Sequence, residues 1–390
     1  MVSKQRVSSK KATVADYQVT AEDAHLSVDS AQSSVPSPPG TLVTAQFKTQ
    51  VRNKELIIWA LAVALLGSCL ASLNSGAIAI PFTDTLKILI HHETTGAGRI
   101  IWNIRLPRVI AAILVGAGLS ISGVGMQSIL KNPLASPYTL GLSNASAFGA
   151  SCAIVFFNSG TQTTSSVIIT NPYMVSISAF VFAMLASLII LALARLTRIS
   201  PESMVLAGIA IGALFSAGLT FMQYLADSIQ LAAIVSWSFG DLGRANWNVN
   251  IILFFSIVPV FIFFLVNRWN FNALDAGEEI AKSLGVQTEL LRILTMLASS
   301  FLAALIVSAF GIIAFVGLLG PHISRRITGS DHRFLLITAP LTGAILLVIA
   351  DMLSRMLLAP MILPVGIITS LLGAPLFIYL LLRRRNQWRM

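Results

Sequence analysis

Apolar residues in this chain are gathered into long runs that begin at Leu56 and are separated by short polar connections. The runs lie at 56–79, 106–130, 138–158, 173–194, 203–225, 247–266, 288–322, 334–358 and 364–382. Most of them are close to the roughly 20 residues that an α-helix needs to cross the hydrocarbon core of a bilayer. The pattern therefore predicts an all-α protein that crosses the membrane many times.

The run 288–322 is too long for one crossing. As a single helix it would reach about 50 Å, whereas the hydrocarbon core is about 30 Å thick. Basic residues flank it on both sides, at Lys282, Arg292, Arg325, Arg326 and Arg333. If both basic clusters are cytoplasmic, the chain crosses an even number of times between them. We therefore predict two short spans that break near Ser308–Gly311, which makes about ten spans in total, with both termini in the cytoplasm.

The distribution of positive charge supports this topology. Cytoplasmic loops of membrane proteins carry an excess of Lys and Arg. Of the 26 Lys and Arg residues, the topology places only six outside, namely Lys87, Arg99, Arg105, Arg108, Arg244 and Arg355. External arginines are exceptions to the rule, so a functional reason for them is expected.

Composition points the same way. The chain is 55% hydrophobic and 11% charged, and its mean hydropathy is +0.81. A soluble domain carries about 25% charged residues. The net charge of +10 comes from residues that flank apolar runs, with no basic patch interleaved with aromatic residues. This excludes nucleic acid as a partner and makes membrane lipid the surroundings of the chain.

Residues 1–55 differ from everything after them. They are rich in Ser, Thr, Val, Ala, Lys and Asp, and they contain the breaker Pro36-Ser-Pro-Pro-Gly40. Because the segment holds no sustained apolar run, it fits neither a signal peptide nor a packed domain. We predict a disordered cytoplasmic tail, residues 1–55, followed by a transmembrane domain, residues 56–390.

Motifs for chemistry are scarce. No G-x-x-x-x-G-K-[ST] sequence occurs, so the chain has no Walker loop for ATP phosphates. The sequence His91-His92-Glu93 is either a metal site at the outer face or, as is far more common for such a run, a solvated loop. No nucleophile and base constellation stands out. We expect no catalytic residue, no metal site and no cofactor bound by this chain.

Ionisable groups are almost absent from the apolar runs. Ion-coupled carriers place Asp, Glu or His near the middle of the membrane to hold the ion or proton. Asp351 is the chief candidate here, but Arg355 lies at i+4, where the two side chains can pair with each other. Energy coupling from another chain is therefore favoured over an ion-coupled carrier.

Small residues recur at helical spacing in two of the runs. They are Gly116, Gly118, Ser120 and Ser122 in one and Gly208, Gly212 and Ser216 in the other. Such faces allow helix backbones to approach closely within a membrane. We interpret them as packing faces.

The polar segment 271–285 lies between two spans on the predicted cytoplasmic side. Leu274, Ala281 and Leu284 fall near helical spacing, acidic residues come early, and Gly285 provides a stop. A short amphipathic helix of this kind can lie on the membrane surface or dock into another protein. The residues alone do not decide between the two.

Four stretches together resemble one known family. The first runs from Arg105-Leu-Pro-Arg108 to Gly-Met-Gln-Ser-Ile-Leu-Lys-Asn-Pro-Leu-Ala-Ser-Pro137, and the second is Leu274-x-x-Gly-Glu-x-x-Ala-x-x-Leu-Gly285. The third joins Phe315-Val-Gly-Leu-Leu-Gly-Pro-His322 to Gly329-Ser-Asp-His-Arg333, and the fourth joins Ala350-Asp-x-x-x-Arg355 to Leu363-Pro-x-Gly366 and Gly373-Ala-Pro375. In this order and spacing they resemble the iron-siderophore, haem and cobalamin permeases of ABC importers, over roughly residues 56–385.

The resemblance implies a vitamin-importer-type (type II) permease with ten spans in the cell membrane of a prokaryote. It also implies a second permease subunit, identical or homologous, two cytoplasmic ATPase subunits that hold ATP and Mg²⁺, and an extracytoplasmic substrate-binding protein. The chain itself would perform no chemistry.

Site residues carried over from the family fall into three groups. Binding-protein docking is expected at Arg105, Arg108 and Arg355, where guanidinium groups would hold carboxylates on the partner. The ATPase coupling helix is expected at Leu274, Gly277, Glu278, Ala281, Leu284 and Gly285. The cytoplasmic gate is expected at Ser200, Pro201, Glu202 and Ser203, although Pro201 and Glu202 depart from the small hydroxyl residues of the family.

A ferric siderophore or another iron complex is the expected cargo, because a bulky chelate suits a pathway lined by small uncharged residues. Haem, cobalamin and an oxyanion such as molybdate are the alternatives. An ion-coupled secondary transporter, or a membrane sensor without transport, is a competing interpretation from another class. Uptake that survives ATP depletion would favour the ion-coupled transporter.

Overall fold

The computed structural model of the chain describes residues 39–76, 80–91, 96–157, 160–163, 166–169, 171–196 and 200–385. It divides into two compact units, Met1–Arg52 and Asn53–Met390. Of the first unit, only the beginning of helix α1 (Pro39–Asn74) is described. All of the packing discussed below lies within the second unit.

Helix α1 begins earlier than the first predicted span. Residues 39–55 were predicted to belong to a disordered tail, but they are helical. Proline is favoured in the first turn of a helix, and neither Gly nor Pro interrupts the sequence between Gly40 and Gly67. The rest of the predicted tail, residues 1–38, lies outside the described residues.

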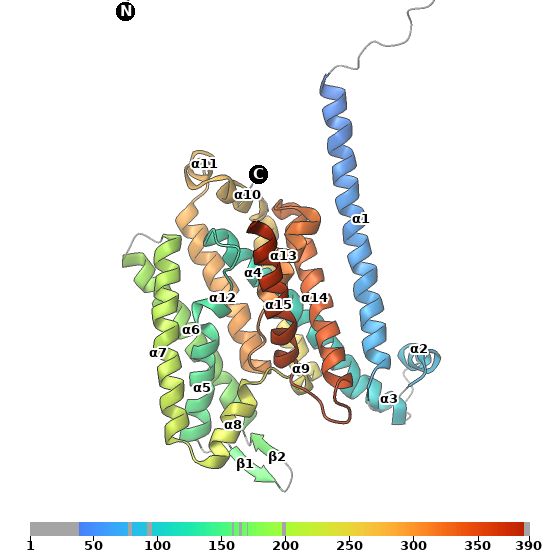
Figure 1. The fold of residues 1–390 in the computed structure, drawn as a ribbon, viewed down its shortest axis with the longest axis vertical. Coiled ribbons are helices and arrows are strands. Elements are labelled where there is room, and N and C mark those ends of the chain that lie inside the picture. The colour runs from blue at the N-terminus through green and yellow to red at the C-terminus, as the bar shows by residue number, and fades with distance from the viewer. Residues whose placement is uncertain are drawn as a thin grey trace, which may run out of the picture. The chain divides into compact units, whose positions relative to one another are not determined.

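Each of the ten predicted spans coincides with a helix (Figure 1). After α1, the helices are α4 (Leu106–Ile129), α5 (Leu142–Phe156), α6 (Pro172–Leu196), α7 (Pro201–Leu225), α9 (Trp247–Val266), α12 (Thr288–Phe310), α13 (Val316–Thr328), α14 (His332–Met356) and α15 (Val365–Arg385). In the described part of the chain, seven helical stretches are long and apolar enough to span a membrane. The prediction of an all-α, multi-pass membrane fold is confirmed.

The long run 288–322 breaks where it was predicted to break, but into unequal parts. α12 ends at Phe310, Gly311 adopts a φ of 79°, and α13 begins only at Val316. With 23 residues, α12 is about 35 Å long and crosses fully, whereas the 13 residues of α13 reach only about 20 Å. The two short spans of the prediction are therefore one full helix and one half-length helix.

Backbone groups released at this break are paired with two other irregular segments. Asp241 N donates to Phe310 O at 2.9 Å, Gly366 N donates to Gly240 O at 3.0 Å, and Phe239 forms a bridge with Ile312. Irregular backbone is tolerated at membrane depth only where protein satisfies its polar groups. The three segments satisfy one another.

Several shorter elements were not predicted. They are α2 (Phe82–His91), α3 (Gly96–Ile100), the π-helical turn η1 (Ile101–Arg105), the 3-10 turns η2 (Tyr138–Leu140) and η3 (Leu242–Arg244), α8 (Ser228–Ser238), and the antiparallel strands β1 (Gly160–Thr163) and β2 (Ser166–Ile169). The predicted helix within 271–285 is two helices, α10 (Arg268–Ala276) and α11 (Glu278–Ser283). Gly277, with a φ of 143°, separates them in a conformation that suits glycine.

Helix α4 lies at the centre of the packing and is buried along most of its length, against α9, α12, α13 and α14. Its small residues allow this. A Cβ on Gly116 would collide with the backbone of Gly343 in α14, and a Cβ on Gly123 would collide with the carbonyl group of Gly317 in α13. Gly212 of α7 similarly meets the backbone of Gly141. The predicted packing role of the small-residue faces is confirmed for α4 and for Gly208 and Gly212 of α7, whereas Ser216 is exposed.

Candidate functional site

Asp351 and two arginines form a buried ionic cluster at one end of the helices. Arg355 Nε donates to Asp351 Oδ2 at 3.1 Å, as the i, i+4 spacing predicted. Arg108 Nε, from α4, donates to Asp351 Oδ1 at 2.7 Å. The carboxylate of Asp351 is fully buried. Because both guanidinium groups bind it, one negative charge compensates two positive ones.

Arg355 and a third arginine, Arg105, bind the carboxyl-terminal end of α1. Arg355 Nη1 donates to Ser75 O at 2.8 Å, and its Nη2 donates to Ser72 Oγ at 2.6 Å. Arg105 Nη1 donates to Leu73 O at 2.6 Å. The cluster thus joins the end of α1 to the beginning of α4 and the end of α14.

This burial bears on the predicted docking arginines. Arg105, Arg108 and Arg355 expose only 6%, 7% and 9% of their surface. Asp241, whose side chain is 39% exposed, lies 3.8 Å from Arg108 Nη2. The three arginines bind groups within the chain itself, and their role in docking stays a prediction. Their excess of positive charge over the nearby carboxylates still favours an acidic partner at this end.

The predicted coupling segment lies at the opposite end (Figure 1), where α4 ends and α12 and α14 begin. Glu278 is held there by a bidentate pair, since Arg292 Nη2 and Nη1 donate to its two oxygens at 2.6 and 3.3 Å. Lys282 Nζ adds a contact at 3.0 Å. Arg292 is buried, so Glu278 fixes the beginning of α11 against α12.

Apolar residues of this segment do not share one face. Leu274 and Ala281 are fully buried within the chain itself, although the spacing had been interpreted as a face for the membrane surface or for another protein. Leu284, predicted to lie on the same face, is 69% exposed, because α10 and α11 diverge at Gly277. Ile280 is 50% exposed as well. The segment therefore has a buried side held by the chain and an exposed apolar side, with Gly285 (φ 82°) ending it.

The Glu278–Arg292 pair predicts a pH dependence of stability. Hydrogen bonds from Arg292 and Lys282 lower the pKa of Glu278 to about 2, while burial acts in the opposite direction. Because the folded-state pKa is depressed below its ordinary value of 4.5, the contribution to the free energy of unfolding is complete above that pH and is lost as the pH falls towards about 2. We expect the difference in thermal stability between the wild type and Glu278→Gln to shrink over this range. A difference that does not vary with pH would contradict the assignment, and Glu279→Gln, an exposed acid, serves as the control.

The predicted gate residues begin helix α7. Ser200 Oγ accepts from Ser203 N at 3.2 Å, and Ser203 Oγ accepts from Ser200 N at 3.2 Å, which makes a reciprocal cap. Pro201 occupies the first helical position and Glu202 the first turn. The departure of Pro201 and Glu202 from small hydroxyl residues thus has a local reason, and gating by this segment stays a prediction.

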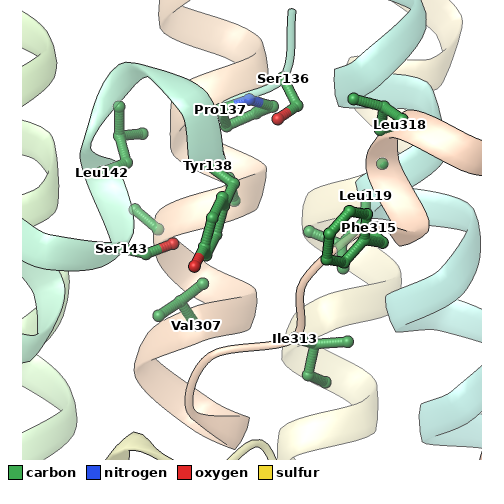
Figure 2. Close-up of a pocket in the computed structure, with 13 residues that line it drawn as sticks. Leu119, Ser136, Pro137, Tyr138, Leu142, Ser143, Val307, Ile313, Phe315 and Leu318 are labelled. Carbon is green, nitrogen blue, oxygen red and sulfur yellow. The ribbon is translucent and has the colours of Figure 1, made fainter. Parts of the chain in front are cut away.

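The residues that the structure describes line a small cavity and a larger one. The small one of about 30 Å³, room for a water, is lined by the η2 turn, α4, α5, α12 and the beginning of α13; Figure 2 shows the rings of Tyr138 and Phe315 on its two sides. The larger one of about 780 Å³ lies near the arginine end. Apart from Asp241 and Arg244, its lining is uncharged and mostly apolar.

Metal binding has no support in the described part of the chain, where no group of three or more His, Cys, Asp or Glu side chains is gathered. His91 ends α2, while His92 and Glu93 lie outside the described residues. Cys69 and Cys152 are free and partly buried.

The sequence pattern of the FecCD transport family matches residues 63–383. The chain belongs to the FecCD transport family. The match starts within α1 and ends within α15, so the arginine cluster, the α10–α11 segment and the residues that line the two cavities described above all lie within the matched range.

Relatives in the family are similar over nearly their whole length. An archaeal chain from Methanocaldococcus jannaschii, named provisionally as an ABC transporter permease, is 46% identical over 87% of this chain and 98% of its own. The hemin transport system permease of Yersinia pestis is 38% identical over 85% and 97%. A solved structure, an inward-facing ABC transporter described provisionally as of metal-chelate type, matches with a TM-score of 0.71 and 31% identity, over 84% of this chain and 99% of that one.

Two ion pairs of these sites were predicted incompletely or not at all. Arg292 was counted only as a cytoplasmic flanking charge, yet it binds Glu278. The pairing of Asp351 with Arg355 was predicted, but its second partner, Arg108, was not. The available signal is a charge placed inside an apolar run, since such a charge must find a partner.

Proposed function

We propose that this multi-pass membrane protein is the permease subunit of an ABC importer that depends on a binding protein. The observation on which the proposal depends is the α10–α11 segment, which Glu278 and Arg292 hold against α12 while Ile280 and Leu284 project away. Exposed apolar side chains on a fixed support are suited to a groove on another protein. Membership of the FecCD transport family supports an ATPase as that partner.

The proposed assembly contains two ATPase subunits, a second permease subunit and an extracytoplasmic binding protein. ATP and Mg²⁺ would be held by the ATPases, and this chain would bind no cofactor and catalyse no reaction. Hydrolysis on the partner would switch the permease between outward-facing and inward-facing states.

Orientation follows from charge. The α10–α11 end also carries Arg292, Arg325, Arg326 and Arg333, and cytoplasmic sides are rich in such residues. We therefore assign this end and both termini to the cytoplasm. The arginine cluster would then face outward, where acidic residues of the binding protein would approach Arg105, Arg108 and Arg355.

Cargo is proposed to be an iron complex, such as a ferric siderophore or haem. The hemin transport relative supports this class, as does the large cavity, whose mostly apolar lining suits a bulky chelate better than a small oxyanion. Cobalamin is the alternative of similar bulk, and molybdate would need more cationic or donor groups than the lining offers.

Purification of the complex tests the proposal. From native membranes in mild detergent, we expect a Walker-containing ATPase to be retained with the chain in stoichiometric amount. The double variant Ile280→Asp and Leu284→Asp should lose the ATPase, because charges would face its apolar groove. Leu357→Asp, an equally exposed residue at the other end of α14, is the matched control and should retain it.

The outcomes separate the competing functions. Recovery of the chain alone under gentle conditions, with uptake that collapses when the ion gradient is removed, would replace the proposal by an ion-coupled carrier. A binding protein recovered with the complex can be titrated with ferric siderophores, haem and cobalamin, and the tightest ligand identifies the cargo class.

A further inference from the structure

His332 lies where three helices meet at the α10–α11 end. It is the first residue of α14 and is fully buried. Its Nε2 lies 3.0 Å from Asp275 Oδ2 of α10 and 3.1 Å from Ser128 Oγ near the end of α4. Its ring packs against Phe271 of α10, with centroids 5.4 Å apart. Since an ionised carboxylate can only accept, Nε2 carries a proton that it donates to Asp275.

A second side chain of α10, that of Asn272, also binds the beginning of α14. Asn272 Oδ1 accepts from His332 N at 2.9 Å, and Asn272 Nδ2 donates to Asp331 Oδ1 at 3.0 Å. Asp331 caps α14 by accepting from Arg333 N. The beginning of α14 is therefore bound to α10 through Asn272 and Asp275 together, independently of the Glu278–Arg292 pair that binds α11 to α12.

Helices α4 and α14 are joined at both of their ends. Ser128 and His332 meet at one end, and Arg108 and Asp351 meet at the other. Between these points the backbones touch at Gly116 and Gly343, leaving no room for a side chain. Two helices held at both ends and packed without gaps move as one body.

We propose that Asp275 and His332 are positioning residues, which transmit a displacement of the α10–α11 segment to the α4–α14 pair and thereby to the arginine cluster. This inference rests on the proposed function, in which an ATPase moves that segment. His332 is buried and therefore lies off the coupling surface, whereas the side chain of Asp275 is 33% exposed and directs Oδ2 at His332. Their contribution lies in the hydrogen bond between them. Without it, only the Asn272 contacts join α10 to the beginning of α14, and α14 would follow α10 less closely.

Distance measurements at both ends test the inference. In a background where Cys69 and Cys152 are replaced by alanine, spin labels at Leu357→Cys and Phe156→Cys report on the arginine end. Labels at Trp269→Cys in α10 and Leu196→Cys report on the α10–α11 end; all four positions are exposed. The complex with its ATPase is compared without nucleotide and with ATP and vanadate.

We expect nucleotide to change both distances in the wild type. Asp275→Ala and His332→Ala should each keep the change at the α10–α11 end and reduce the change at the arginine end by at least half. Because both remove the same link, the double variant should lose no more than either single one. Asp275→Asn, which keeps an acceptor for His332, should retain most of the response, and Glu279→Gln all of it.

A full response at the arginine end in both alanine variants would overturn the inference while leaving the proposed function intact. The inference is also overturned if Asp275→Asn reduces the distance change at the arginine end as much as Asp275→Ala does, because the hydrogen bond to His332 would then not transmit the displacement. If the wild type shows no nucleotide-dependent change even at the α10–α11 end, the proposed function itself fails, and the inference with it. The size of the purified complex, measured for each variant, shows that the variants are assembled.

Discussion

Replacing Asp351 by alanine is expected to be among the most damaging single substitutions in the chain. The variant would leave Arg108 and Arg355 buried without the carboxylate that both of them share. Breaking a buried ion pair by removing one partner costs about 3–5 kcal/mol, mostly because the remaining charge is uncompensated. We expect a large fall in thermal stability in detergent and a small yield of monodisperse protein.

A matched control is available in Asp84, an exposed acid in the first turn of α2. Asp84→Ala should change the free energy of unfolding by no more than about 0.5 kcal/mol. A second comparison is Asp351→Asn, which keeps an acceptor oxygen for one arginine and should be less damaging than alanine. Equal stability of Asp351→Ala and the wild type would show that the arginines are compensated by other groups.

Replacing Gly123 by alanine is expected to destabilise the protein through overpacking. A Cβ at this position would collide with the carbonyl group of Gly317, and Pro321 leaves no space beside it. Neither atom belongs to a flexible side chain, so α4 and α13 would have to separate. Inserting a methyl group into a packed core costs about 1–3 kcal/mol, and more where the obstacle is backbone.

Replacing Gly67 by alanine should not destabilise the protein. Gly67 lies inside α1, where nothing stands within 4 Å of a Cβ. Alanine there removes the entropic cost of glycine in a helix, about 0.5–1 kcal/mol, and should leave stability unchanged or raised. If both variants have the same thermal stability as the wild type, the close approach of α4 and α13 is wrong.

The apolar runs were sufficient to predict most of the helices. α9 occupies 247–266 as predicted, and the break near Gly311 followed from helix length and charge. Such features are local, because the width of the hydrocarbon core decides how long an apolar helix must be. Shorter elements such as α8 escaped prediction, because an apolar stretch of 11 residues has no such requirement to meet.

Side-chain partnerships were harder to predict. That Arg108 would be external followed from the positive-inside rule, but its burial depends on Asp351, 243 residues further along the chain. Leu284 is exposed because the positive φ of Gly277 turns α11 away from α10, and a backbone angle of this kind cannot be inferred from helical spacing. His332 was singled out only as part of the motif Gly329-Ser-Asp-His-Arg333, and its partners Asp275 and Ser128, far away in the sequence, were not predicted.

The hydrogen bonds that join the break after Phe310 to the segments at Gly240 and Gly366 restrict how the helices can move apart. Backbone groups of Phe310, Gly240, Asp241 and Gly366 have each other as hydrogen-bond partners. Separating these segments would break the bonds, and any group left buried without a partner would cost about 1–3 kcal/mol. Helix movements that keep these bonds intact avoid this cost, so the three segments favour a pivoting of the helices over their separation at this point.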